Sequence, residues 1–210
     1  MFSPVSRHSV SLILIILYGK PTGLSIVNLH KVGSKLLCKM TTNIFFKRLA
    51  ICVDIWYIIY RKREEITKMT IYFDMDGTIA NLYGVDGWLD SIIKGHTKPY
   101  RLAKRMFDKE TIETIKTLKE NGATIGIVSW LAKNSTKEYD ERVTKAKLNW
   151  LAKNFNFADE IHIVPYGTDK KSVVLDKNGY LVDDEIGNLK AWGNKTINAK
   201  EMKKELKKLL

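Results

Sequence analysis

A short apolar run that ends in paired acids constrains this chain more than any other feature. Ile71-Tyr72-Phe73 leads directly into Asp74-Met75-Asp76-Gly77-Thr78. Alternate side chains of an extended strand point to the same side, so Asp74 and Asp76 are expected to lie together. Gly77 allows the backbone to turn sharply just beyond them. The pattern therefore predicts two carboxylates at the C-terminal end of a buried strand, where open α/β sheets bind ligands.

A solvated turn and a calcium-binding loop are the alternative interpretations of this segment. An EF-hand loop requires a Glu at its twelfth position. The twelfth residue counted from Asp74 is Val85, so the EF-hand interpretation lacks an essential ligand. The interpretation as a solvated turn remains an alternative at this point.

Two further apolar runs also end in polar residues. Ala123 to Val128 follows a helix stop at Asn121-Gly122 and ends at Ser129. Tyr180-Leu181-Val182 opens into Asp183-Asp184-Glu185. Adjacent acids at a strand end repel one another, and a bound cation removes that cost. Oxygen ligands suit the hard ion Mg²⁺, so the third run predicts a magnesium site.

Taken in order, these segments resemble the motifs of the haloacid dehalogenase-like (HAD) superfamily of phosphohydrolases, and the resemblance covers about residues 70–190. It implies that Asp74 is a nucleophile that becomes an aspartyl-phosphate and that Asp76 is a general acid/base. It also implies that the Ser129 hydroxyl and the neighbouring backbone N–H of Trp130 hold a phosphoryl oxygen.

The same resemblance implies a magnesium site. Asp74, the backbone carbonyl of Asp76 and Asp183 would hold the ion, while Asp184 would orient the metal shell or a phosphate-binding lysine. An Asp at position 76 also separates this chain from dehalogenases of the family, which lack the acid, and from transport ATPases, which carry Thr there. Phosphatase or phosphotransferase chemistry is therefore expected.

A lysine between the second and last motifs is also expected, and two neighbours qualify. Lys170 and Lys171 precede Ser172-Val173-Val174. The Lys-Ser-Val-Val order resembles the Lys-Thr-Val-Val segment of the 5'(3')-deoxyribonucleotidases within the superfamily, which favours Lys171. A compact ammonium at this point would neutralise phosphate. A second segment, Lys147-Leu148-Asn149-Trp150-Leu151, resembles a Lys-x-x-Trp-apolar stretch of the same enzymes.

Strands alternating with helices predict an α/β fold with a Rossmann-like, three-layer parallel sheet and right-handed crossovers. About 50 residues separate the first two motifs, which leaves room for a small helical cap at about 80–107. Trp88, Tyr100 and Trp130 are candidates for base stacking or a lid, with core packing as the alternative. Helices are expected from Asp108 to Asn121, from Ser135 to Asn154 and after Asn198.

Residues 1–68 form a leader of doubtful status before a catalytic domain at 69–210. The leader holds 11 Lys+Arg against 3 acids and both cysteines, whereas the domain holds 24 against 20. Val10 to Tyr18 has the length of a signal-peptide core, but no A-x-A-like cleavage site follows it. Leu49 to Tyr60 contains Asp54 and is too short to span a bilayer as a helix of about 20 residues. We expect translation to start at Met69, with a membrane anchor and a secretory signal as alternatives.

The sequence thus predicts a cytoplasmic, Mg²⁺-dependent phosphomonoester hydrolase. Its expected substrate is a small phosphorylated metabolite such as a (deoxy)nucleoside monophosphate. The lysines of the last helix are interpreted as a solvated face, so nucleic acid is not an expected partner. Two alternatives stay open, a phosphatase that processes nucleic-acid ends and a membrane-tethered, noncatalytic binding protein.

Overall fold

The computed structural model describes residues 44–67 and 69–210. The chain divides into two compact units, Met1–Ile55 and Trp56–Leu210. The second unit therefore begins inside the predicted leader rather than at Met69. The apolar run from Val10 to Tyr18 lies outside the described residues, as does Cys38.

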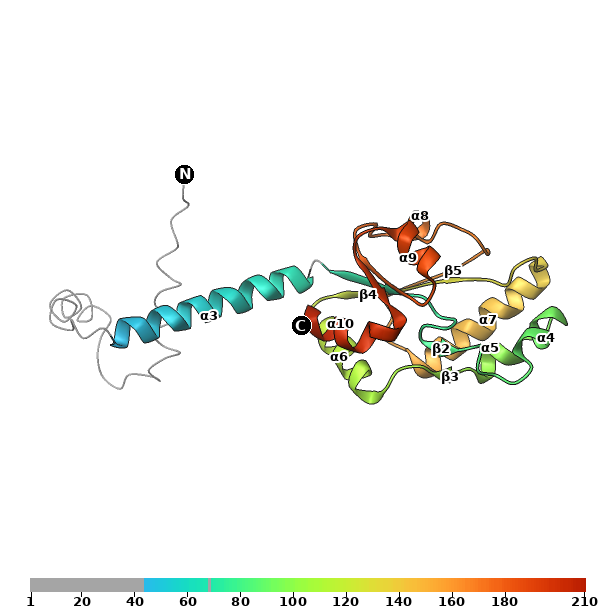
Figure 1. The fold of residues 1–210 in the computed structure, drawn as a ribbon, viewed down its shortest axis with the longest axis horizontal. Coiled ribbons are helices and arrows are strands. Elements are labelled where there is room, and N and C mark those ends of the chain that lie inside the picture. The colour runs from blue at the N-terminus through green and yellow to red at the C-terminus, as the bar shows by residue number, and fades with distance from the viewer. Residues whose placement is uncertain (1–43, 68) are drawn as a thin grey trace. The chain divides into compact units, whose positions relative to one another are not determined.

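A five-stranded parallel sheet forms the centre of the second unit, in the order β5-β4-β1-β6-β7 (Figure 1). This confirms the expected α/β class. Ile71 in the central strand lies opposite Ile125 on one side and Tyr180 on the other. The strands are β1 Thr70–Phe73, β4 Thr124–Trp130, β5 Glu160–Val164, β6 Tyr180–Asp183 and β7 Thr196–Asn198.

Buried apolar side chains lie on both faces of this sheet, as expected for a parallel sheet covered by helices. One cluster includes Phe73, Ile115 and Leu206 and joins the sheet to helices α6 and α10. Another includes Tyr72 and Trp192 and joins it to α9. The covering helices are α6 Lys109–Glu120, α7 Lys137–Asn154, α8 Lys170–Val173, α9 Ile186–Trp192 and α10 Met202–Leu209.

The helix starts follow the capping residues that the sequence supplies. The Asp108 carboxylate accepts a hydrogen bond from Thr111 N at 2.8 Å, and this bond satisfies one of the free donors in the first turn of α6. Thr136 caps α7, which begins two residues later than the expected Ser135. Asn198 caps the short 3₁₀ helix η1 Ala199–Glu201, which leads into α10.

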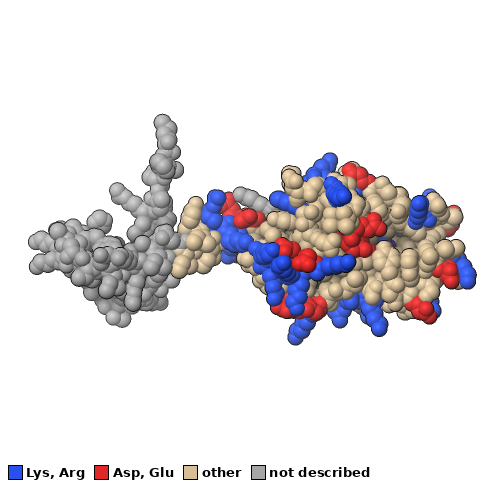
Figure 2. Space-filling model, viewed as in Figure 1, with Lys and Arg blue, Asp and Glu red and all other residues tan. Residues whose placement is uncertain are grey.

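Acidic and basic side chains alternate over much of the face shown in Figure 2. Some of the lysines of α10 are paired across helices. Lys203 lies 2.6 Å from a carboxylate oxygen of Asp108 and 2.5 Å from one of Glu110, and Lys207 also pairs with Glu110. These pairs are exposed, so screening by solvent leaves them little effect on stability.

The segment between β1 and α6 forms a small substructure of its own. Two short strands pair antiparallel, and two short helices lie between them. Tyr139 of α7 donates a hydrogen bond to the His96 carbonyl at 3.0 Å, and Trp150 donates to the Ala103 carbonyl at 2.7 Å, so this segment is fastened to α7. The elements are β2 Ala80–Asn81, α4 Trp88–Ile93, α5 Lys98–Leu102 and β3 Lys104–Arg105.

A single helix, α3 Ile44–Thr67, contains the second apolar run of the leader. No helix of the described residues is both long and apolar enough to cross a membrane. Ile58 and Ile59 are 64% and 60% exposed, whereas Ile66 near the helix end is 3% exposed and belongs to the main core. The last turn of α3 therefore packs as part of the sheet unit, although whether the leader is present in the mature protein stays a prediction.

Candidate active site

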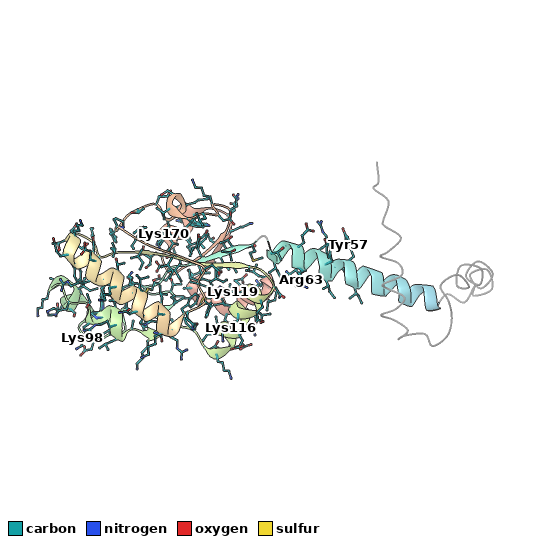
Figure 3. All side chains as sticks on the ribbon, turned by 180° about the vertical axis from the view of Figure 1, so that it is seen from behind. Tyr57, Arg63, Lys98, Lys116, Lys119 and Lys170 are labelled. Carbon is teal, nitrogen blue, oxygen red and sulfur yellow. The ribbon has the colours of Figure 1, made fainter. Side chains whose placement is uncertain are left out.

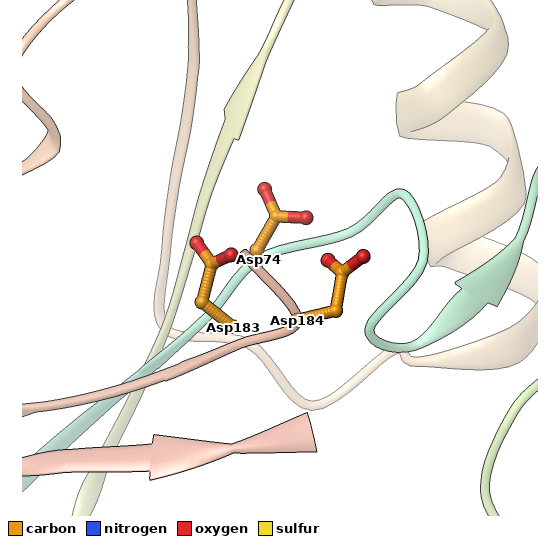
Figure 4. A group of neighbouring side chains, drawn as sticks. All are labelled: Asp74, Asp183 and Asp184. Carbon is orange, nitrogen blue, oxygen red and sulfur yellow. The ribbon is translucent and has the colours of Figure 1, made fainter. Parts of the chain in front are cut away.

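Two adjacent strands bring the predicted acids together. The Asp74 backbone N–H donates to the Val182 carbonyl at 2.9 Å, so the pairing of β1 with β6 continues to the first acid. Asp183 is the last residue of β6, and Asp184 follows it. One carboxylate oxygen from each of these three acids lies within 4.8 Å of the other two (Figure 4). Parallel pairing thus gathers acids from distant parts of the sequence at one sheet edge.

A buried lysine lies between two of these acids. The Lys170 ammonium is 2.7 Å from Asp74 Oδ1 and 2.7 Å from Asp183 Oδ2, and its side chain is 4% exposed. It also lies 5.1 Å from the centre of the Trp130 ring. Burial alone would lower the Lys170 pKa, but the two carboxylates outweigh burial and raise it. Lys170 is therefore a cation at neutral pH. Figure 3 labels it within the sheet unit.

The prediction that Lys171 rather than Lys170 is the phosphate-binding lysine is wrong, because Lys170 is the one that lies at the acids. Lys171 Nζ donates to the Trp192 carbonyl at 2.7 Å and does not line the acid cavity. Asp169 caps α8, accepting from Lys171 N at 3.0 Å, and Lys170 is the first residue of that helix. Adjacent helical residues point about 100° apart, because a turn holds 3.6 residues, so only one of the two lysines can face the acids.

Lys147 of α7 is a second buried lysine, absent from the predicted site. Its ammonium donates to Asp76 Oδ2 at 2.6 Å, to Ser129 Oγ at 2.9 Å and to the Trp130 carbonyl at 2.6 Å. The side chain is fully buried. These three acceptors occupy all three ammonium protons. A sequence signal did exist, because Lys147 falls between Val143 and Trp150 on the apolar face of the predicted helix.

Asp76 has two unequal carboxylate oxygens. Oδ2 accepts from Lys147, whereas Oδ1 is buried and has no hydrogen-bond partner among the described residues. Burial raises the Asp76 pKa, and the nearby Asp74 charge adds to the increase, against the opposing effect of Lys147. A carboxyl group in this setting holds a proton more readily than a solvated one.

Asp184 belongs to the acid cluster itself, whereas we expected it to act from outside by orienting the metal shell or a lysine. Its Oδ1 accepts from Thr78 Oγ1 at 3.1 Å, and its backbone N–H donates to that same hydroxyl at 3.1 Å. Burial, followed by the charge of Asp74, raises the pKa of Asp184 to about 6. Gly77 has φ 85°, and a Cβ placed there would lie 2.4 Å from Asp184 Oδ2. The turn therefore requires glycine for its conformation and for space.

Asp183 is the most buried of the acids, with no exposed area. The Glu185 backbone N–H donates to Asp183 Oδ1 at 2.8 Å, and the Asn188 amide donates to both carboxylate oxygens. Burial and the Asp74 charge raise the Asp183 pKa, and Lys170 opposes that increase.

The charges of the site favour a divalent cation. Four carboxylates, of Asp74, Asp76, Asp183 and Asp184, lie against the two ammonium groups of Lys147 and Lys170. Full ionisation would leave a net charge of −2, and burial, together with the charge of Asp74, raises the pKa values of three of these acids. An all-oxygen cluster suits a hard cation such as Mg²⁺, although Ca²⁺ and Mn²⁺ also accept such ligands. The residues therefore fit the expected metal without identifying it.

One cavity of about 850 Å³ is lined by the four carboxylates, Lys170 and Asn188, whereas the buried Lys147 is not part of its lining. Ser129 lies in its wall and is 1% exposed. The Trp130 indole N–H donates to the Thr168 carbonyl at 2.8 Å, and its ring packs against Tyr166 at a centroid distance of 5.0 Å. Of the other expected aromatic residues, Tyr100 is 3% exposed and Trp88 also lines the cavity. Every residue predicted for the site except Lys171 therefore faces this cavity.

Comparison of the chain with models of protein families finds no match, and neither does comparison with curated proteins.

Proposed function

We propose that this protein is a Mg²⁺-dependent phosphomonoester hydrolase of the HAD-like superfamily that works through an aspartyl-phosphate. The observation that carries the proposal is the convergence of four acids and Lys170 on one cavity at the C-terminal ends of β1, β4 and β6, with the buried Lys147 paired to Asp76. The substructure at about 80–107 would then be the small cap inserted after the first strand.

In the first step, a carboxylate oxygen of Asp74 attacks phosphorus, and the bond from phosphorus to the ester oxygen breaks. Asp76 gives its proton to the departing oxygen, so an alcohol leaves. Its raised pKa supports this role, because the acid must enter the step protonated. Oδ1 is the oxygen we assign to the proton, since Oδ2 is held by Lys147.

In the second step, the ionised Asp76 takes a proton from water, and the water oxygen attacks phosphorus. The bond between phosphorus and Asp74 breaks, which releases inorganic phosphate and restores both carboxyl groups. Lys170 lies beside the Asp74 oxygen and carries one ammonium proton that has no acceptor among the described residues. That proton is placed to stabilise a phosphoryl oxygen as charge develops on it.

Mg²⁺ would be held by carboxylates of Asp74, Asp183 and Asp184, and it would reduce the repulsion between the nucleophile and the phosphoryl group. The Lys170 ammonium would reduce the same repulsion. Lys147 acts on Asp76 and Ser129 and fixes their orientation. The Ser129 hydroxyl can donate its own proton to a phosphoryl oxygen while it accepts from Lys147.

The cavity size supports a small phosphorylated metabolite as substrate, since its volume of about 850 Å³ lies within the range of small-molecule sites. A (deoxy)nucleoside monophosphate is the example we favour, because Trp88, Trp130 and Tyr166 offer aromatic faces in the cavity wall. The protein would act in the cytoplasm.

The test is hydrolysis of a phosphomonoester panel by the full chain with Mg²⁺, beside the nearly isosteric Asp74→Asn variant. Wild type should release phosphate, and acid-quenched samples should carry one added phosphoryl group on the peptide that contains Asp74. Asp74→Asn should show neither, with an unchanged circular dichroism spectrum. Substantial turnover by Asp74→Asn would refute the covalent mechanism. Salt-sensitive oligonucleotide binding would instead favour processing of nucleic-acid ends.

A further inference from the structure

The cations that line the cavity fall into two groups. Lys170 is buried and paired with carboxylates. Lys94, Lys133 and Arg142 line the same cavity but are exposed. Within the described residues, no carboxylate lies at ion-pair distance from the charged nitrogens of this second group. The cavity thus combines a buried end in which carboxylates outnumber cations and an exposed side with three unpaired cations.

Aromatic faces, rather than acids, hold two of these three cations. The Arg142 guanidinium lies 5.4 Å from the centre of the Tyr139 ring, and Lys133 Nζ lies 5.7 Å from the centre of the Tyr166 ring. A cation–π contact restricts a long side chain and leaves its N–H donors free. Arg142 uses one donor, Nε, for the Glu138 carbonyl at 3.3 Å. Its remaining guanidinium protons have no partner among the described residues.

Packing between α7 and the 80–107 segment brings Arg142 next to the loop that carries Lys94. A Cβ placed on Gly95 would lie 3.9 Å from Arg142 Nη2, so the guanidinium lies next to the residue that follows Lys94. The hydrogen bond from Tyr139 to His96 fastens the same loop to α7. Two cations from separate elements are therefore held beside each other at the cavity.

We propose that Lys94, Lys133 and Arg142 form a second anion subsite, so that the substrate is a phosphomonoester with another anionic group, a phosphate or a carboxylate, at its far end. This inference rests on the proposed function. The phosphoryl group that reacts would lie at the acid cluster beside Lys170. The second group would be bound by the guanidinium and ammonium donors at the exposed side. A cavity of about 850 Å³ has room for a substrate that reaches both.

The test compares substrates that differ in the second charge alone. Thymidine 5'-phosphate is set against thymidine 3',5'-bisphosphate, and the open-chain glucitol 6-phosphate against 6-phosphogluconate, so the two pairs separate phosphate from carboxylate. We expect kcat/KM to be at least tenfold higher for one or both of the doubly anionic members. In the Lys133→Gln/Arg142→Gln variant this ratio should fall about tenfold. Lys145→Gln, which removes an exposed cation of α7 that does not line the cavity, should leave the ratio unchanged.

Binding to the Asp74→Asn variant gives a readout that needs no turnover. Calorimetry should show tighter binding of the doubly anionic members, and adding the Lys133→Gln/Arg142→Gln changes should remove that difference. If wild type hydrolyses nothing but the binding difference is found, the subsite stands and the proposed reaction fails. If both members of each pair bind and react alike, or if the double variant keeps the wild-type ratio, the subsite is refuted.

Discussion

Replacing Lys147 by Met should destabilise the protein strongly, because it removes the one hydrogen-bond donor that the Asp76 carboxylate has among the described residues. The ammonium has no exposed area and serves three acceptors. Breaking a buried ion pair by removing one partner costs about 3–5 kcal/mol. For a domain of this size, that loss corresponds to a decrease in melting temperature of roughly 6–20 °C.

The stability lost in Lys147→Met should be larger at high pH than at low pH. The folded-state pKa of Asp76 is raised above its ordinary value of 3.8, so the folded protein binds a proton that the unfolded chain releases. The unfolding free energy contributed by Asp76 therefore falls as pH rises through that raised value. Lys147→Met removes an opposing cation and raises the Asp76 pKa further, so the variant should be closer to wild type at pH 5 than at pH 8.

Urea unfolding of wild type, Lys147→Met, Asp76→Asn and the double variant measures the coupling between the two side chains. We expect the double variant to be more stable than Lys147→Met by more than 1 kcal/mol, because no unpaired charge is then buried. Lys145→Met, an exposed position on the same helix, should change stability by less than about 0.5 kcal/mol. A Lys147→Met protein within that margin of wild type, or additive effects of the two substitutions, would refute the role given to this pair.

Three further predictions concern the acid cluster and its neighbours. EDTA should abolish phosphatase activity and Mg²⁺ should restore it, and activity in chelator would contradict the metal site. The Mg²⁺ concentration for half-maximal activity should rise as pH falls through about 6, because Asp184 then binds a proton. Lys170→Met should lower kcat at least 100-fold, whereas Lys171→Met should keep it within about threefold, and equal losses would overturn the assignment. Gly77→Ala should lose both stability and activity, since φ 85° and the 2.4 Å approach of Asp184 leave no room for a methyl group, and a thermal melt like that of wild type would show otherwise.

The sheet and its acids could be predicted because their signals are local. An apolar run of strand length, ended by Asp or Ser, fixes both the element and the end at which its polar residue emerges. β1, β4 and β6 each carry such a signal. Parallel pairing then places Asp74, Ser129 and Asp183 at one edge without any further information. The helix caps at Asp108 and Asn198 are local in the same sense.

The lysines could not be assigned in this way. Lys170 and Lys171 have the same chemistry and adjoin one another, so only the rotation of the short helix α8 decides which ammonium reaches Asp74. That rotation follows from packing and from the Asp169 cap. The motif pattern in the sequence shows neither of these, so it cannot separate two adjacent lysines. Lys147 contacts Asp76 across 71 residues of sequence. Its sequence signals were a position on an apolar helix face and the Lys-x-x-Trp-apolar resemblance, and neither shows which acid it contacts.

The leader illustrates a different limit. A boundary at Met69 follows from the absence of periodic, capped elements before it, yet the last turn of α3 contributes Ile66 to the main core. One buried side chain at a helix end carries little periodic signal. If translation starts at Met69, the core loses this residue, and the remaining domain must close over the exposed side chains of its neighbours.

The crowding of acids at the ends of β1 and β6 has an evolutionary consequence. Three of the four carboxyl groups have raised pKa values, so the folded metal-free protein opposes its own ionised site. Asp184→Asn removes a charge while it keeps the side-chain shape and an acceptor for Thr78, so it would make the metal-free fold more robust. A lineage selected for foldedness alone would drift toward Asn at this position, and only a use for the carboxylate, such as holding a cation, would oppose that drift.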